Sequence, residues 1–260
     1  MIQADSSFGT HPTISLGCGP LCTFNYDSLI SSALAIVVTI GVAFWLRSRL
    51  QEREPSKVQA VFEWGYDQLR GLIKENVADD ALFIIPLAMT LFLYILIANW
   101  IEIFPLGIFP ILHGANADLN QTLAMAVIVI GVVQWYSVRT LGWFGYFRRF
   151  TKPFEMPLAF RIVYAPFNVL EEVVKPVTLS LRLFGNIFAG SVMILLIAGF
   201  GNLALPLVGT VGGAIIGALL LFVWKAFDVI FIGFIQAFIF MILTVVYFGA
   251  AREGLEHEHH

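Results

Sequence analysis

The stretch FNVLEEVVKPVTLSLRLFGNIFAGSVMILLIAGF, residues 167–200, decides the fold class of this chain. Its apolar residues recur with helical spacing, and no charged residue follows Arg182 within it. A helix over this range is roughly 50 Å long, whereas the hydrocarbon core of a bilayer is only about 30 Å thick. We therefore expect a membrane helix that tilts steeply or projects at its cytoplasmic end.

A second long helical pattern follows over 207–249. Gly201, Asn202 and Pro206 lie between the two patterns and predict a break in the helix there. Because the connection carries no charge, it can lie on the outer side of the membrane. We expect the two segments to form a long, steeply tilted hairpin.

The composition of the whole chain also indicates a membrane protein. Of its 260 residues, 58% are hydrophobic and 13% are charged, against about 25% charged in ordinary soluble domains. Disordered chains are less hydrophobic than this, and soluble surfaces carry more charge. A formal net charge of -3 excludes a nucleic-acid binder held by a basic surface.

Three shorter apolar stretches precede the hairpin, over 27–46, 82–104 and 122–141. Two basic clusters follow the first and third stretches: Arg47, Arg49, Arg53 and Lys57, then Arg148, Arg149, Lys152 and Arg161. Because basic loops stay in the cytoplasm, residues 1–26 should lie outside and the C-terminus inside. The expected fold is all-α integral membrane, with five crossings in one membrane domain over 1–260. Cys18 and Cys22 either pair in an oxidising compartment or remain free thiols.

Residues 56–77 predict a different kind of helix. Apolar residues recur along one face, from Val58 to Val77, and charged residues fill much of the remainder. Ser56 followed by Gln59 resembles a capping box. We expect an amphipathic helix on the cytoplasmic membrane surface or against a partner, with a solvated connector as the alternative.

Polar residues form one stripe along the helix predicted over 167–200. At about 100° per residue, four of them fall within about 40° of Arg182: Glu171, Lys175, Thr178 and Asn186. An arginine buried in a membrane costs between about 2.5 and 17 kcal/mol, and it does not lose its proton. Arg182 must therefore meet an anion, water or a polar cavity. One alternative is an ion pair with Asp228 in the next helix.

The last predicted helix carries its own polar set. Lys225 and Asp228 are three residues apart and could form an ion pair. In a regular helix, Gln236 lies at about +20° and Asp228 at about -60° from Lys225. The other reading of Asp228 is a proton relay, the usual role of an acid inside a membrane. Further polar residues at the outer ends could line a water-filled funnel or lie at the interface: Asn99, Glu102, His113, Asp118 and Asn120.

Residues 175–190, KPVTLSLRLFGNIFAG, resemble the signature of ATP synthase subunit a, the stator channel subunit of the membrane sector. Residues 236–240, QAFIF, resemble the last-helix motif of this family. Residues 99–105 resemble its second-span motif, and residues 118–122 its outer-loop motif. The similarity covers nearly the whole chain in the expected order, from about Thr23 to Ala251.

The resemblance implies a proton-translocating stator with two offset half-channels in the membrane of a bacterial cell. A ring of c subunits, each with one carboxylate, would rotate past it, and a peripheral-stalk b subunit would hold it within the ATP synthase complex. A neutral carboxylic acid can face lipid, but a carboxylate cannot do so cheaply. A fixed cation favours the ionised form of the carboxylate that reaches it. The resemblance implies no cofactor, no metal and no enzymatic activity of the chain on its own.

By this resemblance Arg182 is the stator charge, with Asn186 and Gln236 beside it. The outer funnel would include Asn99, Glu102 and Asp118, and Glu171 or Glu172 would mark the inner exit. Many members of the family have an acid or a histidine where this chain has Ser191. We expect Asp228 to supply that missing group from the neighbouring helix.

Two other classes of function compete with this interpretation. A secondary transporter or stand-alone channel predicts internal repeats and a complete binding site within one chain, and the sequence shows no repeat. A membrane scaffold without transport would tolerate the loss of Arg182 if its packing survived.

Overall fold

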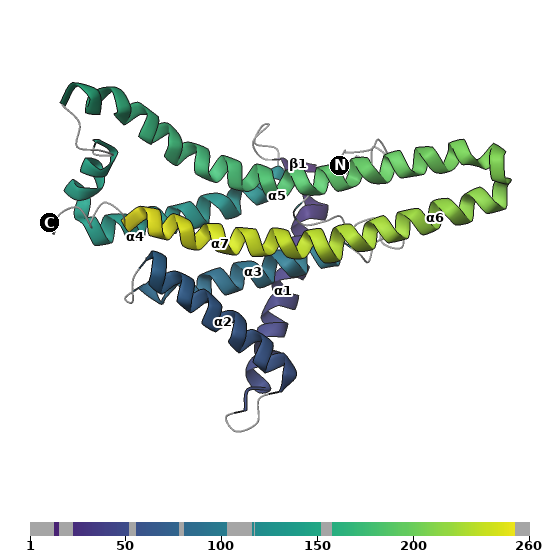
Figure 1. The fold of residues 1–260 in the computed structure, drawn as a ribbon, viewed down its shortest axis with the longest axis horizontal. Coiled ribbons are helices and arrows are strands. Elements are labelled where there is room, and N and C mark those ends of the chain that lie inside the picture. Colours follow the sequence, from purple (N-terminus) through teal and green to yellow (C-terminus); the bar gives the residue numbers. More distant parts are fainter. Residues whose placement is uncertain are drawn as a thin grey trace. The chain divides into compact units, whose positions relative to one another are not determined.

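The computed structural model of the protein describes residues 13–15, 23–51, 56–77, 81–102, 116, 118–151 and 158–252. Figure 1 shows a helical chain with one short β-ribbon near its N-terminus. The elements, in chain order, are β1 (Thr13–Ser15), β2 (Thr23–Asn25), α1 (Tyr26–Ser48), α2 (Lys57–Asn76), α3 (Ile84–Ile101), α4 (Leu119–Thr151), α5 (Leu158–Val208), α6 (Thr210–Ala226), the π-helix η4 (Phe227–Ile232) and α7 (Gly233–Arg252).

The predicted all-α membrane fold class is confirmed. Five helical segments of the described chain are long and apolar enough to cross a membrane: Tyr26–Ser48, Ile84–Ile101, Leu119–Phe147, Pro166–Phe200 and Val211–Ala251. α2 is too polar to be among them. The sequence pattern did not predict the ribbon, in which β1 and β2 pair antiparallel with Ile14 opposite Phe24.

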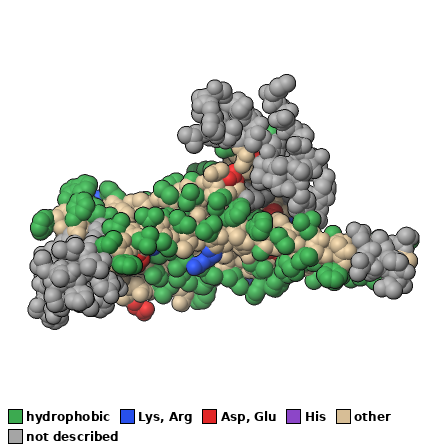
Figure 2. Space-filling model, turned by 90° about the horizontal axis from the view of Figure 1, so that it is seen from above, with side chains coloured by type: hydrophobic (Ala, Val, Ile, Leu, Met, Phe, Trp, Pro, Cys, Tyr) green, Lys and Arg blue, Asp and Glu red, His purple; other side chains and the backbone are tan. Residues whose placement is uncertain are grey.

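The chain divides into two compact units. Unit 1 comprises Met1–Phe44, Leu93–Gln121 and Leu183–Ala237, and unit 2 comprises Trp45–Phe92, Thr122–Arg182 and Phe238–His260. On the face shown in Figure 2, hydrophobic side chains cover much of the described surface and charged ones are few. Such a surface suits contact with lipid or with other apolar helices.

Unit 2 is built around a hydrophobic core to which α2, α3, α4 and α7 all contribute. Its buried members include Leu69, Ile85, Tyr136, Met241 and Phe248. Phe83, Tyr136 and Phe248 contact one another, with ring centroids 5.4 to 6.0 Å apart. Each large apolar side chain removed from water in this way contributes about 1.5–3 kcal/mol.

α2 uses only part of its predicted apolar face for this core. Ser56 caps the helix, because its hydroxyl accepts a hydrogen bond from the backbone N–H of Gln59 at 3.2 Å. The Gln59 side chain bonds to Gln51 and Glu63 rather than back to Ser56, so only half of the capping box forms. Leu69 and Ile73 are buried in the core, which rules out a plain solvated connector, whereas Val58, Val61 and Trp64 are exposed.

The break predicted at Gly201, Asn202 and Pro206 is wrong. α5 continues as helix to Val208, and the chain turns at Gly209, whose φ of 82° is strained for residues with a Cβ. Within unit 1 this turn joins the C-terminal part of α5 to α6 as the predicted hairpin (Figure 1). α5 also starts earlier than predicted, at Leu158.

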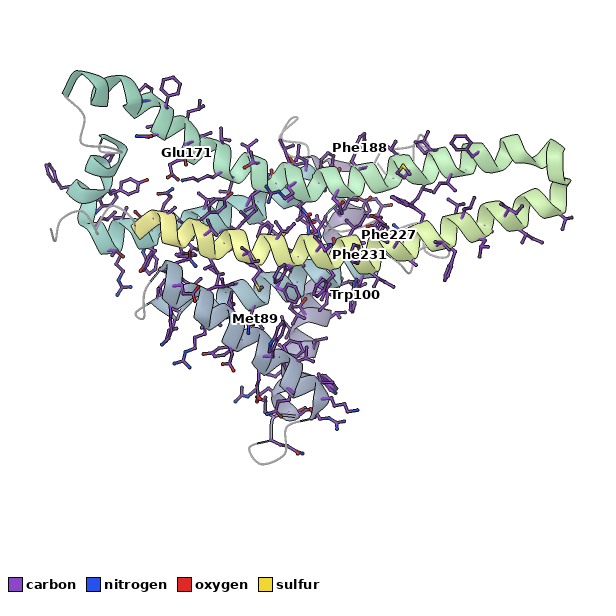
Figure 3. The ribbon with its side chains drawn as sticks, viewed as in Figure 1. Met89, Trp100, Glu171, Phe188, Phe227 and Phe231 are labelled. Carbon is purple, nitrogen blue, oxygen red and sulfur yellow. The ribbon has the colours of Figure 1, made fainter. Side chains whose placement is uncertain are left out.

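The sequence pattern predicted one uniform final helix, but the structure differs from this prediction. Residues 227–232 form the π-helix η4, in which the Gly233 N–H bonds to the Asp228 carbonyl five residues earlier. Phe227 and Phe231 stack on its exposed side, with ring centroids 5.2 Å apart (Figure 3). π-turns are rare and often mark functional positions, and Asp228 lies in this one.

Candidate functional site

Arg182 lies on α5 within the candidate span Pro166–Phe200, between the apolar residues Leu181 and Leu183. Its side chain is exposed, and it makes no ion pair with another residue in the described part of unit 2. Arginine stays protonated at physiological pH. A permanent positive charge is therefore presented among apolar side chains. Because α5 is a continuous helix, the spacing that aligns the polar stripe with Arg182 is retained.

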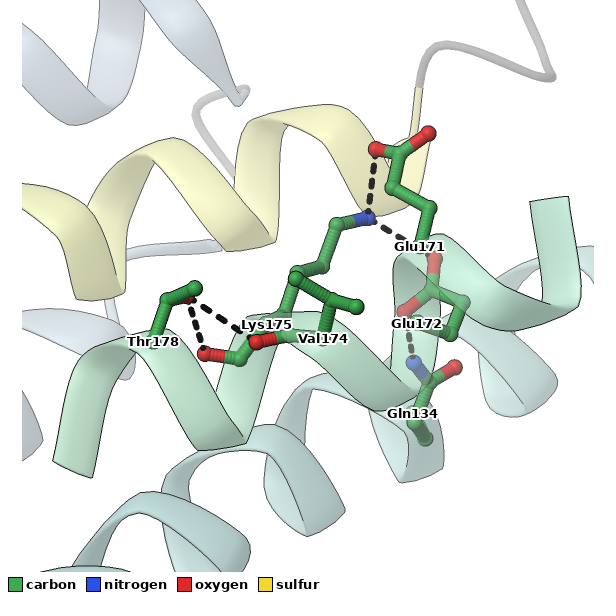
Figure 4. Close-up of polar contacts among 6 residues, drawn as sticks. All are labelled: Gln134, Glu171, Glu172, Val174, Lys175 and Thr178. Atoms are coloured by element: carbon green, nitrogen blue, oxygen red, sulfur yellow. Dashed lines mark hydrogen bonds and ion pairs between the residues drawn. The ribbon is translucent and has the colours of Figure 1, made fainter. Parts of the chain in front are cut away.

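The acidic residues Glu171 and Glu172 form a charged cluster in unit 2 with Lys175 and with Gln134 of α4 (Figure 4). Lys175 Nζ lies 2.9 Å from Glu172 Oε1 and 3.4 Å from Glu171 Oε1. Gln134 donates a hydrogen bond to the other oxygen of Glu172. The Glu171 side chain is 66% exposed and that of Glu172 only 16%. Glu172 is thus held within the cluster, whereas Glu171 reaches its surface.

In unit 1, an ion pair joins the end of α3 to α6. Lys225 Nζ lies 2.7 Å from Glu102 Oε1, and the two side chains are only 12% and 18% exposed. The sequence spacing had allowed a local pair between Lys225 and Asp228, but the ion pair that forms is with Glu102. These partners are 123 residues apart in the chain, so no local pattern predicts the contact.

Asp228 is buried in unit 1, with 7% of its surface exposed. Its carboxylate lies against the backbone of α5 at Gly190, where a Cβ would be 2.7 Å from Asp228 Oδ2 and 3.2 Å from Oδ1. Only a residue without a side chain leaves room for the carboxylate there. Ser191, next in the chain, donates its hydroxyl to the Ile187 carbonyl of its own helix.

Asn99 connects α3 to the start of α7. Its side-chain NH₂ donates to the Gly233 carbonyl at 3.2 Å, and its oxygen accepts from Asn116 at 2.9 Å. Asn99 and Asn116 are both buried. Within unit 1, two predicted funnel residues therefore bond to the helices on either side of Asp228, Asn99 to α7 and Glu102 to α6.

The π-turn corrects the angles predicted for the last helix. A regular helix would separate Asp228 and Gln236 by about 80°, and would align Gln236 with Lys225. One wide turn absorbs about one extra residue, or about 100°, which brings Asp228 and Gln236 to within about 20°. In agreement, Asp228 and Gln236 are both 7% exposed, whereas Lys225 is less deeply buried.

The sequence analysis missed a set of polar residues at the start of α1. Ser32 donates to Gln121, which in turn donates to the Tyr94 hydroxyl at 2.8 Å. The hydroxyls of Ser28 and Ser31 are buried and have no hydrogen-bond partner within the described part of the chain. Serines three and four residues apart in an apolar span are the signal that could have revealed this set.

The predicted funnel residue Asp118 accepts a hydrogen bond from Asn25 at 2.8 Å, also in unit 1. Asn186 is half-buried on α5. His113, Cys18 and Cys22 lie outside the described residues, so their predicted roles stay predictions. Across the ranges that the structure covers, no group of three His, Cys, Asp or Glu side chains could hold a metal ion.

Comparison with known proteins is consistent across the chain. The model of the family described as "ATP synthase A chain" matches residues 29–249. The chain is 36% identical to ATP synthase subunit a of Mycobacterium ulcerans, covering 100% of this chain and 98% of the relative. It is 37% identical to that of Mycobacterium tuberculosis over the same shares, and 33% identical to that of Bacillus pumilus over 86% and 91%. The matched range includes every predicted site residue, and the chain therefore belongs to the ATP synthase A chain family.

Proposed function

We propose that this chain is the proton-translocating stator subunit of a rotary ATP synthase. It provides two half-channels that open to opposite sides of the membrane and a fixed arginine that faces a ring of c subunits. A proton enters from outside, neutralises a ring carboxylate, travels with the ring, and leaves through the inner half-channel. The membrane potential supplies about 2.3 kcal/mol per proton per 100 mV.

The observation that carries the proposal is the exposed guanidinium of Arg182 on an apolar candidate span. Exposing a permanent charge within a membrane is costly unless an anion meets it. A ring carboxylate is such an anion. It is neutral while it faces lipid, and it ionises beside Arg182, which favours proton release and blocks a direct leak.

The polar groups of unit 1 support an outer half-channel. Asp228 is the relay that receives the proton. Its carboxylate lies against Gly190, and the next residue, Ser191, carries a hydroxyl that cannot take the place of an acid. Asn99, Glu102 and Asp118 belong to the entrance, and Asn186 and Gln236 belong to the same proton path. In unit 2, Glu172 marks the inner exit, with Glu171 at its surface.

The same assignment covers partners and orientation. The complex is the ATP synthase of a bacterial plasma membrane, and a peripheral-stalk b subunit restrains this chain while the ring turns. The N-terminus lies outside and the C-terminus in the cytoplasm. The charge distribution supports this orientation, because clusters of Lys and Arg follow the first and third apolar stretches.

The test is ATP-driven proton pumping in inverted membrane vesicles that contain the complete complex with Arg182→Ala. We expect pumping to fall to background although the complex assembles. Arg139→Ala is the matched control, because Arg139 is also exposed and its guanidinium carbon lies 5.3 Å from the centroid of the Trp135 ring. Normal pumping with Arg182→Ala would refute the stator mechanism. Asp228→Asn tests the relay separately, and unchanged pumping there would remove Asp228 from the path.

A further inference from the structure

Lys225 is the only Lys or Arg in the sequence of unit 1. The carboxylates in the described part of this unit are Asp27, Glu102, Asp118 and Asp228. The sequence motifs that indicate the family do not include Lys225.

The ammonium of Lys225 is placed to act on two of these acids. It forms a short, mostly buried ion pair with Glu102, at 2.7 Å. Asp228 lies three residues further along the chain, about one helical turn from Lys225. We call Glu102, Lys225 and Asp228 the charge triad. With both acids ionised it has a net charge of minus one, so a single proton makes it neutral.

Without the ammonium ion, the two carboxylates would repel each other, and one would retain a proton to relieve the repulsion. The ammonium ion is paired with Glu102 at 2.7 Å, and this leaves Asp228 as the acid of the triad that exchanges the proton. The lysine thereby separates the roles of two nearby acids. A structural ion pair, by contrast, would merely connect α3 to α6.

We propose that Lys225 is a positioning residue that sets the charge of the outer half-channel, so that the charge triad exchanges one proton at a time through Asp228. The proposal rests on the proposed function, in which Asp228 is the relay. Because Lys225 acts through its charge, what matters is the net charge of the triad rather than the presence of the ion pair.

Four variants of the complete complex separate charge from packing. With every acid counted as ionised, Lys225→Met has a formal charge of minus two, and Glu102→Gln, with one acid and one lysine, has a formal charge of zero. The double variant Lys225→Met/Glu102→Gln removes the ion pair but restores minus one. Lys225→Arg keeps the charge. All are compared with the wild type by ATP-driven proton pumping in inverted vesicles, normalised to assembled complex.

We expect each single neutralisation to lower pumping about tenfold, equivalent to about 1.4 kcal/mol. The double variant lacks Glu102 of the entrance, but it should still pump better than either single variant, and Lys225→Arg should pump within about threefold of the wild type. A double variant no better than the better single variant would overturn the proposal, as would normal pumping with Lys225→Met. If the single variants do not assemble, a double variant that assembles and pumps supports the proposal, and one that assembles without pumping overturns it.

Failure of this proposal is distinguishable from failure of the relay assignment. If Asp228→Asn abolishes pumping while the double variant shows no recovery, Asp228 remains the relay and only the role of Lys225 is wrong. If Asp228→Asn pumps normally, the relay itself is wrong, and the charge triad loses its function with it.

Discussion

Replacing Gly190 by alanine should disable proton transport without unfolding the protein. The added methyl group would lie 2.7 Å from Asp228 Oδ2 and 3.2 Å from both Oδ1 and Cγ. Ordinary contact begins at 3.4 Å. The carboxylate must therefore retreat by about 0.7 Å, because atoms closer than contact distance repel steeply.

The energetic balance predicts a functional defect rather than a structural one. Overpacking costs about 1–3 kcal/mol, but the carboxylate is the end of a side chain and can rotate, which favours the low end. Alanine in place of glycine within a helix returns about 0.5–1 kcal/mol. A misplacement of about 1 Å at a reacting group, by contrast, costs up to about a hundredfold in rate. We expect pumping to fall by about tenfold or more.

The assay is ATP-driven pumping in inverted vesicles, with the amount of assembled complex measured on the same membranes. Gly199→Ala is the matched control, since Gly199 is on the same helix in unit 1 and a Cβ there meets nothing within 4 Å. Equal pumping by the Gly190 and Gly199 variants would refute the conclusion that the close approach of Asp228 to α5 matters for transport.

Two further predictions concern unit 2. Gly249→Ala should destabilise it by about 1–3 kcal/mol, because a Cβ there would lie 2.8 Å from the backbone oxygen of Asn76, which cannot rotate away. The thermal stability of the purified complex measures this, with Gly131→Ala, where a Cβ meets nothing within 4 Å, as the neutral reference. Glu172→Gln should lower pumping several-fold and Glu171→Gln much less, because Glu172 is the less exposed carboxylate and binds two partners; equal effects would contradict the assignment of Glu172 to the exit.

The sequence predicted the helices well wherever hydrophobicity alone determines them. The span predicted over 82–104 is observed as α3, Ile84–Ile101, and that over 27–46 as α1, Tyr26–Ser48. The end of α5 was wrong because glycine, asparagine and proline lower helix propensity without excluding a helix that its surroundings support. The positive φ of Gly209, which turns the chain, depends on the tertiary structure.

For the candidate site, residue types were easier to predict than contacts. Asp228 and Glu102 were identified because charged residues in apolar segments are costly. The ion pair of Glu102 with Lys225 was not, because it joins residues 123 positions apart. η4 was missed for a related reason: the apolar pattern is the same whether the backbone bonds to the fourth or to the fifth residue.

The wide turn of η4 also affects how insertions and deletions in this helix should be read. Asp228 precedes Gln236 by eight positions, yet both are buried, because the turn takes up about one residue. A homologue with one residue fewer and a regular helix would present the same group about seven positions before its glutamine. Gapless alignment would then pair Asp228 with an unrelated neighbour. Equivalent residues in this segment should be matched by the face of the helix on which they lie. In such a homologue the missing residue and the missing wide turn offset each other, so the equivalent group lies on the same face as Asp228.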